Sequence, residues 1–126
     1  MINCKNFKIL VMGRSGSGKT TFCNILRPFL NSHLYLNNDF IRNKTNNHDF
    51  SIEGRKKASI IISELADNCS GIVLIDMICP LKEMREIIKP DLIFYINREG
   101  NKKYSDTDSI FQPPEKNECS FIFEIN

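Results

Sequence analysis

Eight residues near the N-terminus, from Gly13 to Thr20, match the pattern G-x-x-x-x-G-K-[ST] at every fixed position. An apolar run rich in β-branched residues precedes them at 7–12 and predicts a buried strand. A helix is expected from Gly18 to about Pro28, where the proline ends or kinks the helical pattern. Strand, glycine-rich loop and helix in this order are the context of a phosphate-binding loop, or P-loop.

This segment predicts a nucleotide site with a magnesium ion. Its glycines let backbone N–H groups face phosphate oxygens, and the helix N-terminus adds partial positive charge. Lys19 is expected to bridge the β- and γ-phosphates, and the Thr20 hydroxyl to bind Mg²⁺. Arg14, at a variable position, is expected to face solvent. The predicted nucleotide-binding residues are Gly13, Arg14, Ser15, Gly16, Ser17, Gly18, Lys19, Thr20 and Thr21.

The rest of the chain alternates strands and helices. Strands are predicted at 33–36, 71–75, 92–96 and 120–125, and helices at 51–68 (with Ser51 as N-cap) and 80–89. A turn is expected at 37–39, and polar loops at 43–49 and 97–117. The first helix is expected to have an apolar face formed by Phe22, Ile25, Leu26 and Phe29.

These elements predict an α/β protein with a three-layer P-loop nucleoside triphosphate hydrolase-type fold and a five-stranded, mainly parallel sheet. We expect a single domain over residues 1–126, a usual length for one hydrophobic core.

Composition excludes several classes of protein. The net charge of +2 makes nucleic acid an improbable partner, and no apolar run is long enough to span a membrane. Five cysteines, an odd number without C-x-x-C spacing, favour reduced thiols and a cytoplasmic location. Residues 101–104 lack the aspartate of the guanine-reading N-K-x-D motif, which disfavours a GTPase. A small P-loop kinase fits a chain of this length.

A second group of residues follows the predicted strand at 33–36. Asp39 precedes Arg42 by three residues, so both would lie on one face of a helical turn. The carboxylate could accept a proton from an attacking hydroxyl while the guanidinium binds an anion, or the two could form a surface ion pair. Asp76, at the end of the strand at 71–75, could bind Mg²⁺ or simply cap the strand.

These motifs together resemble the adenylylsulfate (APS) kinase family. The family pattern G-x-S-G-[SA]-G-K-[ST]-T is similar to residues 13–21, and L-D-G-D-N-[VI]-R to 36–42. D-L-G-F-S-x-x-D-R is similar to 49–55, F-I-S-P to 77–80, and Y-E-x-P-E to 111–115. The order and spacing of the motifs hold over most of the chain.

The resemblance implies an ATP- and Mg²⁺-dependent kinase that phosphorylates the ribose 3′-hydroxyl of a small nucleotide. It implies catalytic roles for Lys19 and Asp39, with Asp39 as the base, and it implies homodimers. The substrate-binding residues that it implies are Arg42, Phe50, Arg55, Ile78 and Cys79. Lys102 and Lys103 could form a reduced phosphate clamp or belong to a solvated loop.

Departures from the family pattern leave the acceptor nucleotide open. Asn37 replaces the first aspartate of D-G-D, Cys79 replaces a serine, and Ala58 stands where an asparagine is usual. Asp76 stands where small hydroxylated residues are common, and the lid at about 97–114 is short. APS and cytidine diphosphoramidate are both candidate acceptors. The alternatives are a nucleotide-binding sensor or regulatory module without turnover, and a 5′-polynucleotide-type kinase, which the low net charge disfavours.

Overall fold

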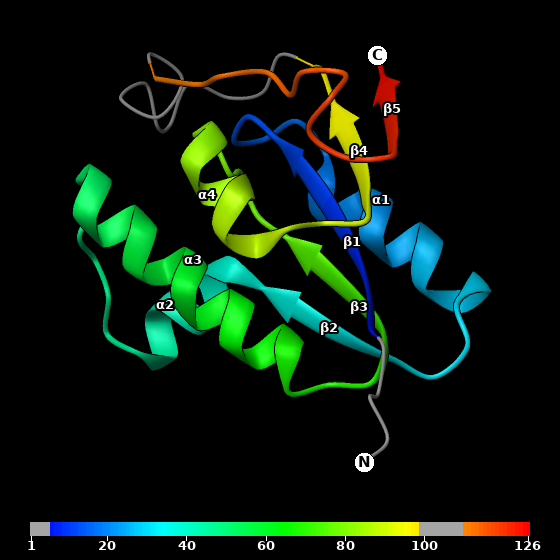
Figure 1. Ribbon diagram of the computed structural model, residues 1–126, viewed down its shortest axis with the longest axis horizontal. Coiled ribbons are helices and arrows are strands. Elements are labelled where there is room, and N and C mark those ends of the chain that lie inside the picture. Colours follow the sequence, from blue (N-terminus) through cyan, green and yellow to red (C-terminus); the bar gives the residue numbers. More distant parts are fainter. Residues whose placement is uncertain (1–5, 99–109) are drawn as a thin grey trace.

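The computed structural model describes residues 6–98 and 110–126. A five-stranded sheet lies at the centre of this described part (Figure 1). The strands are β1 Asn6–Gly13, β2 His33–Asn37, β3 Gly71–Asp76, β4 Leu92–Ile96 and β5 Phe121–Ile125. Their order in the sheet is β2-β3-β1-β4-β5, and all four pairings are parallel. The predicted five-stranded sheet is confirmed, and it is parallel throughout.

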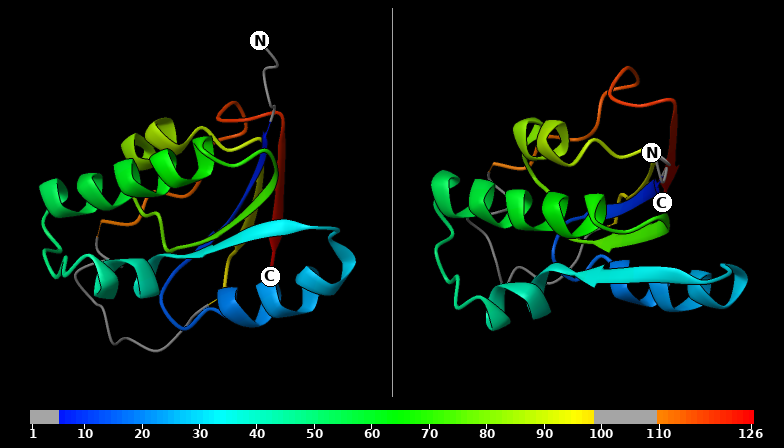
Figure 2. Two further views of the ribbon diagram at one scale, coloured as in Figure 1. Left: turned by 90° about the horizontal axis from the view of Figure 1, so that it is seen from below. Right: turned by 60° about the horizontal axis from the view of Figure 1, so that its bottom comes forward.

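Helices cover both faces of this sheet. They are α1 Lys19–Leu26, α2 Asn38–Lys44, α3 Ile52–Asp67 and α4 Lys82–Ile88, and a short 3₁₀ turn, Arg27–Phe29, extends α1. Figure 2 shows α1 on one side of the sheet and α3 and α4 on the other, which confirms the three-layer prediction. Ser51 caps α3 as predicted, because its hydroxyl accepts a hydrogen bond from the Gly54 N–H.

The core has two parts, one on each face of the sheet. Leu10 and Met12 of β1 belong to the cluster under α3 and α4, whereas Ile9 and Val11 belong to the cluster with Cys23 of α1. Alternate residues of β1 are therefore buried on opposite faces, as the uninterrupted apolar sequence of this strand predicts. In the described residues, no helix is long and apolar enough to cross a membrane.

Two local predictions were wrong. The turn expected at 37–39 is the start of α2, because the Asn37 side chain accepts a hydrogen bond from the Phe40 N–H and caps the helix. The apolar face predicted for the first helix is incomplete, since Ile25 and Phe29 are 63% and 82% exposed. Phe29 follows Pro28 in the 3₁₀ turn, whose tighter winding rotates it away from the sheet.

The topology brings three connections to one edge of the sheet. The P-loop follows β1, α2 follows β2, and residues 77–80 follow β3. Because β1, β2 and β3 are parallel neighbours, these connections all lie at their carboxyl ends, where ligands bind in open α/β sheets.

Candidate active site

The P-loop joins β1 to α1 in a conformation that requires glycine. A Cβ atom at Gly13 would lie 2.5 Å from the Ile96 carbonyl oxygen and 2.8 Å from Ser17 Oγ. Gly18 has a φ of 103° and precedes α1 without a side-chain cap, so it leaves the first N–H groups of the helix uncapped. Lys19 Nζ donates to the Arg14 carbonyl oxygen at 3.0 Å and lies beside the cavity described next.

A cavity of about 310 Å³ lies between the P-loop and the ends of β2 and β3. Its lining residues are Ser15, Gly16, Gly18, Lys19, Thr20, Thr21, Asn37, Asp39, Asp76, Met77 and Ile78. We call this space the donor cavity. It brings together most of the predicted nucleotide-binding residues, both predicted metal ligands and both predicted catalytic residues.

Asp76 receives hydrogen bonds from three side chains at the rim of the donor cavity. Its Oδ2 accepts from Thr20 Oγ1 at 2.8 Å, from the Tyr35 hydroxyl at 2.7 Å and from Asn37 Nδ2 at 3.3 Å. Burial, together with the nearby Asp76 carboxylate, raises the pKa of Tyr35 to about 12, so its hydroxyl stays protonated and donates.

The Thr20–Asp76 pair fits a magnesium ion. A threonine hydroxyl at the start of the P-loop helix and an aspartate at a neighbouring strand end are the oxygen ligands that P-loop enzymes use for Mg²⁺. Both residues line the donor cavity, and Asp76 is only 4% exposed. Thr20 and Asp76 would therefore hold the ion beside the space for the phosphates.

Asp39 lies in the first turn of α2 and lines two cavities. One is the donor cavity, and the other is a smaller space of about 50 Å³, which we call the acceptor cavity. The acceptor cavity is lined by Asn38, Asp39, Arg42, Phe50, Arg55, Met77, Ile78, Cys79, Pro80 and Met84. These include Arg42, Phe50, Arg55, Ile78 and Cys79, the predicted substrate-binding residues that the structure describes.

Arg42 and Arg55 are buried and hold the segment that carries Phe50. Arg42 Nη2 donates to the Asp49 carbonyl oxygen at 2.6 Å, and Arg55 Nε donates to the Phe50 carbonyl oxygen at 2.8 Å. Both guanidinium groups also face the Phe50 ring, at 4.5 Å and 5.7 Å from its centroid. The two arginines thus shape the acceptor cavity, and no ion pair joins Asp39 to Arg42.

A family model described as adenylylsulphate kinase matches residues 5–99, most of the chain. The chain belongs to this family. Among curated proteins, none has a sequence significantly similar to that of this chain.

Similar solved structures include an APS kinase, a sugar kinase and Kti12. Mycobacterium tuberculosis APS kinase CysC, in complex with AMPPNP and APS, is 20% identical with a TM-score of 0.65, over 95% of this chain and 88% of that one. A sugar kinase from Janibacter sp. is 16% identical with a TM-score of 0.71, over 95% and 86%. Chaetomium thermophilum Kti12, in complex with ADP-AlF3, is 15% identical with a TM-score of 0.67, over 94% and 88%. At these identities the likeness establishes the fold.

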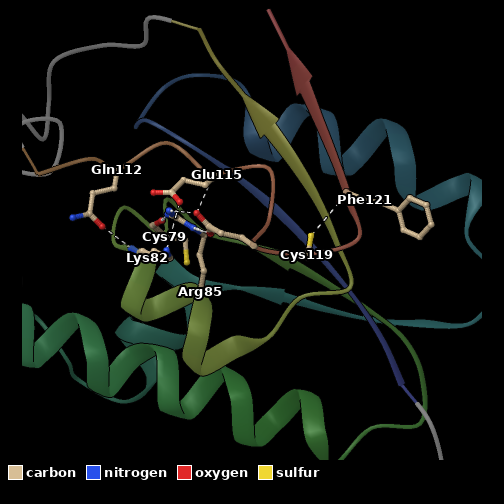
Figure 3. Close-up of polar contacts among 8 residues, drawn as sticks. Cys79, Lys82, Arg85, Gln112, Glu115, Cys119 and Phe121 are labelled. Atoms are coloured by element: carbon tan, nitrogen blue, oxygen red, sulfur yellow. Dashed lines mark hydrogen bonds and ion pairs between the residues drawn. The ribbon is translucent and has the colours of Figure 1, made fainter.

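The C-terminal segment contacts the loop that follows β3 and the start of α4 (Figure 3). Arg85 Nη1 donates to the Cys79 carbonyl oxygen at 2.8 Å, and Arg85 Nε donates to Glu118 Oε1 at 2.6 Å. The Gln112 N–H donates to the Pro80 carbonyl oxygen at 2.7 Å. These bonds hold Cys79 in a left-handed conformation with a φ of 49°. The predicted 111–115 motif therefore contacts the loop that follows β3, through Gln112.

A larger cavity, of about 560 Å³, lies beside Arg85 and Glu118. Arg85 and Glu118 line it together with residues of the segments that precede β4 and β5. None of the predicted site residues lines it. The P-loop residues line the donor cavity, and Asp39 lines both of the smaller cavities.

The solvent-facing position expected for Arg14 was wrong. Its guanidinium carbon lies 4.6 Å from the centroid of the Phe111 ring, which in turn stacks on Tyr95. Arg14 is therefore half-buried, because the C-terminal segment supplies an aromatic surface beside the P-loop. The predictions for Lys102 and Lys103, and most of the predicted lid, lie outside the described residues.

Sequence reasoning missed several residues of the site. Tyr35 lies two positions before Asn37 on β2, so both side chains point to the same face of the sheet. This spacing was the one signal in the sequence that could have placed both beside Asp76. Asn38 stands where the family has glycine, and that departure was overlooked. Nothing in the sequence pairs Arg85 with Glu118, because 33 residues separate them.

Proposed function

We propose that this chain transfers the γ-phosphoryl group of ATP to the 3′-hydroxyl of a small nucleotide. The observation that carries the proposal is the position of Asp39, which lines both the donor cavity and the acceptor cavity. A carboxylate at the junction of two substrate sites can accept a proton from one substrate as it attacks the other. Membership of the adenylylsulphate kinase family supports this reading.

In the proposed reaction, the 3′-oxygen of the acceptor nucleotide forms a bond to the γ-phosphorus of ATP. The bond from that phosphorus to the β,γ-bridging oxygen breaks, its electron pair leaves with ADP, and the 3′-hydroxyl proton passes to the Asp39 carboxylate. The P-loop N–H groups and Lys19 bind the donor phosphates. Positioning of the two substrates and neutralisation of charge supply most of the rate.

Thr20 and Asp76 would hold Mg²⁺, which supplies charge neutralisation at the β- and γ-phosphates when it is bound. Tyr35 and Asn37 orient the Asp76 carboxylate for this role through their hydrogen bonds to Oδ2. Arg42, Phe50 and Arg55 bind and orient the acceptor nucleotide. A homodimer and a cytoplasmic location remain predictions, and the four described cysteines, all free thiols, are compatible with a reducing compartment.

The test measures formation of ADP and of phosphorylated product from Mg-ATP with APS and with cytidine diphosphoramidate. Asp39→Asn is expected to lower kcat by about a hundredfold or more while the affinity for ATP stays the same. Glu64→Gln, which neutralises an exposed carboxylate of α3, is the matched control and should turn over like the parent. ATP binding without turnover of either nucleotide would contradict the proposal and favour a nucleotide-binding sensor.

A further inference from the structure

The C-terminal segment, residues 111–118, contacts a loop of each substrate site. The Phe111 ring lies 4.6 Å from the guanidinium carbon of Arg14, which belongs to the P-loop. One residue later, the Gln112 N–H donates to the Pro80 carbonyl oxygen at 2.7 Å, and Pro80 lines the acceptor cavity. Two consecutive residues therefore connect the loop that forms the donor site with a loop that forms the acceptor site.

At the donor end of this connection, Phe111 and Arg14 form a partly buried contact. Phe111 is 9% exposed, and its ring stacks on that of Tyr95 in β4, with 5.8 Å between the centroids. Arg14 Nη1 also donates to the Tyr95 hydroxyl at 3.4 Å. A guanidinium over an aromatic ring is attracted by the π electrons, and more strongly where water is excluded. The Arg14 side chain is therefore held by the C-terminal segment and by β4.

The backbone of Arg14 is bonded to the lysine that is proposed to bind the donor phosphates. Its carbonyl oxygen accepts hydrogen bonds from Lys19 Nζ at 3.0 Å and from the Ser17 N–H at 3.1 Å. The Lys19 ammonium has three N–H donors, so it can bind a phosphate oxygen and keep its bond to Arg14. Phosphates bound by Lys19 and by the P-loop N–H groups would therefore also order the Arg14 peptide group.

At the acceptor end, the connection holds a loop with an unfavourable backbone conformation. Cys79 has a left-handed φ of 49°, which residues other than glycine rarely adopt. Besides its bond to Pro80, Gln112 accepts a hydrogen bond of 2.8 Å from the Lys82 N–H through its side-chain oxygen (Figure 3). Arg85 Nη1 donates to the Cys79 carbonyl oxygen at 2.8 Å. The wall of the acceptor cavity that Cys79 and Pro80 form thus depends on the order of the C-terminal segment.

We infer that Arg14 and Phe111 are positioning residues that couple the two substrate sites, so that a nucleotide in the donor cavity increases the affinity for the acceptor. This inference rests on the proposed kinase function. Donor phosphates order the P-loop and Arg14, Arg14 restrains Phe111, and Phe111 restrains the neighbouring Gln112 on the acceptor loop. The acceptor nucleotide then has less disorder to remove when it binds. The coupling favours the complex that contains both substrates.

Calorimetry measures the coupling as a ratio of dissociation constants. APS and cytidine diphosphoramidate are each titrated into the protein alone and into the protein saturated with AMPPNP and Mg²⁺. For each nucleotide that binds, Kd should be at least about fivefold lower with AMPPNP, and the nucleotide should lower the Kd of AMPPNP by the same factor. Equal Kd values with and without AMPPNP, or binding of neither nucleotide, would overturn the inference.

Three variants test the contact itself. Phe111→Leu keeps an apolar side chain in the core but removes the ring, and Arg14→Leu removes the guanidinium. Each should bring the ratio of the two Kd values close to one, and the double variant should give the same ratio as either single variant, because both substitutions break one contact. Phe111→Tyr, which restores an aromatic ring, should keep the parent ratio. A ratio close to that of the parent in Arg14→Leu or Phe111→Leu would contradict the inference.

The matched control is Lys44→Leu. Lys44 also lies over an aromatic ring, that of Phe40 at 5.4 Å, but neither residue lines the donor or the acceptor cavity. This variant loses a cation and its ring contact as Arg14→Leu does, and it should keep the parent ratio. A ratio lowered equally in Lys44→Leu and in Arg14→Leu would assign the coupling to general charge and reject the role of the Arg14–Phe111 contact.

Turnover measured in parallel separates this inference from the proposed function. A ratio of fivefold or more that is lost in Phe111→Leu, without phosphorylated product, would support the coupling and reject the kinase. Phosphorylated product together with a ratio close to one would support the kinase and reject the coupling.

Discussion

Asn37 and Asp76 are register partners at the ends of β2 and β3, and Asn37 Nδ2 donates a hydrogen bond of 3.3 Å to Asp76 Oδ2. The amide also caps α2 through its oxygen, which accepts from the Phe40 N–H at 3.1 Å. One side chain thus fixes both the Asp76 carboxylate and the start of the helix that carries Asp39. The family pattern has aspartate at the position of Asn37. With asparagine there, Asp76 is the one carboxylate of this pair of register partners at the ends of β2 and β3.

Replacement of Asn37 by aspartate should make folding depend on magnesium. Aspartate caps a helix as well as asparagine does, but it would put a second negative charge against Asp76. The free energy of unfolding should fall by about 2 kcal/mol in EDTA, and Mg²⁺ with ATP should recover most of it. Asn37→Ser, which keeps a cap without the charge, is the control. Urea denaturation in the two buffers measures the effect, and an equal loss in both would count against a metal at this position.

Gly13→Ala should abolish nucleotide binding as well as reduce stability. The added Cβ would lie 2.5 Å from the Ile96 carbonyl oxygen, which is backbone and cannot move without shifting β4. We expect a loss of about 2–3 kcal/mol in the free energy of unfolding and no measurable binding of ATP. Gly71→Ala, at a φ of 92° with no atom within 4 Å of its Cβ, should cost about 1 kcal/mol and leave ATP binding intact. Comparable ATP binding by both variants would disprove the role given to Gly13.

Glu118 should contribute stability that is lost in acid. Burial alone would raise its pKa, but hydrogen bonds from Arg85 and from the Glu115 N–H lower it below the usual 4.5. A group whose pKa is lower in the folded state stabilises fully above its unfolded value, and this contribution disappears as the pH falls through the lowered value. Glu118→Gln should therefore lower the free energy of unfolding by about 3 kcal/mol at pH 7. The difference in this free energy between the variant and the parent should shrink below pH 4.5.

The control for that substitution is Glu83→Gln, in an exposed ion pair with Lys56. It should change stability little at any pH, because exposed pairs are screened by solvent. Urea denaturation between pH 7 and pH 3 measures both variants. A difference between Glu118→Gln and the parent that stayed constant over this range would show that the pair does not act through charge.

Because Arg85 also holds the Cys79 carbonyl oxygen, Glu118→Gln should raise the KM of the acceptor nucleotide more than that of ATP.

The sequence predicted the sheet, its helices and the P-loop because these depend on local patterns. Apolar runs mark β1 and β3, and the fixed glycines and lysine of the P-loop allow few other structures. Asp76 was singled out because it ends a strand, and it accepts a hydrogen bond from Thr20, the other residue predicted to bind magnesium. The start of α2 was missed because Asn37 favours turns and helix caps equally, and only the following residues decide between them.

Contacts between distant segments could not be read from the sequence. Arg14 was expected in solvent, but the Phe111 ring that covers it belongs to a segment almost a hundred residues later in the chain. Arg42 was expected to bind an anion, and the structure also gives it two backbone carbonyl partners across the loop before α3. Such pairings depend on how the elements pack, which no local pattern encodes.

The central claim is that Asp39 takes the proton of a 3′-hydroxyl as that oxygen attacks ATP. The most direct measurement follows transfer of phosphorus from γ-labelled Mg-ATP to a nucleotide that turns over and to the same nucleotide lacking its 3′-hydroxyl. The account predicts labelled product and matching ADP only with the intact nucleotide, and a rate lowered about a hundredfold in Asp39→Asn. Label on the nucleotide without a 3′-hydroxyl, or undiminished transfer by Asp39→Asn, would contradict it.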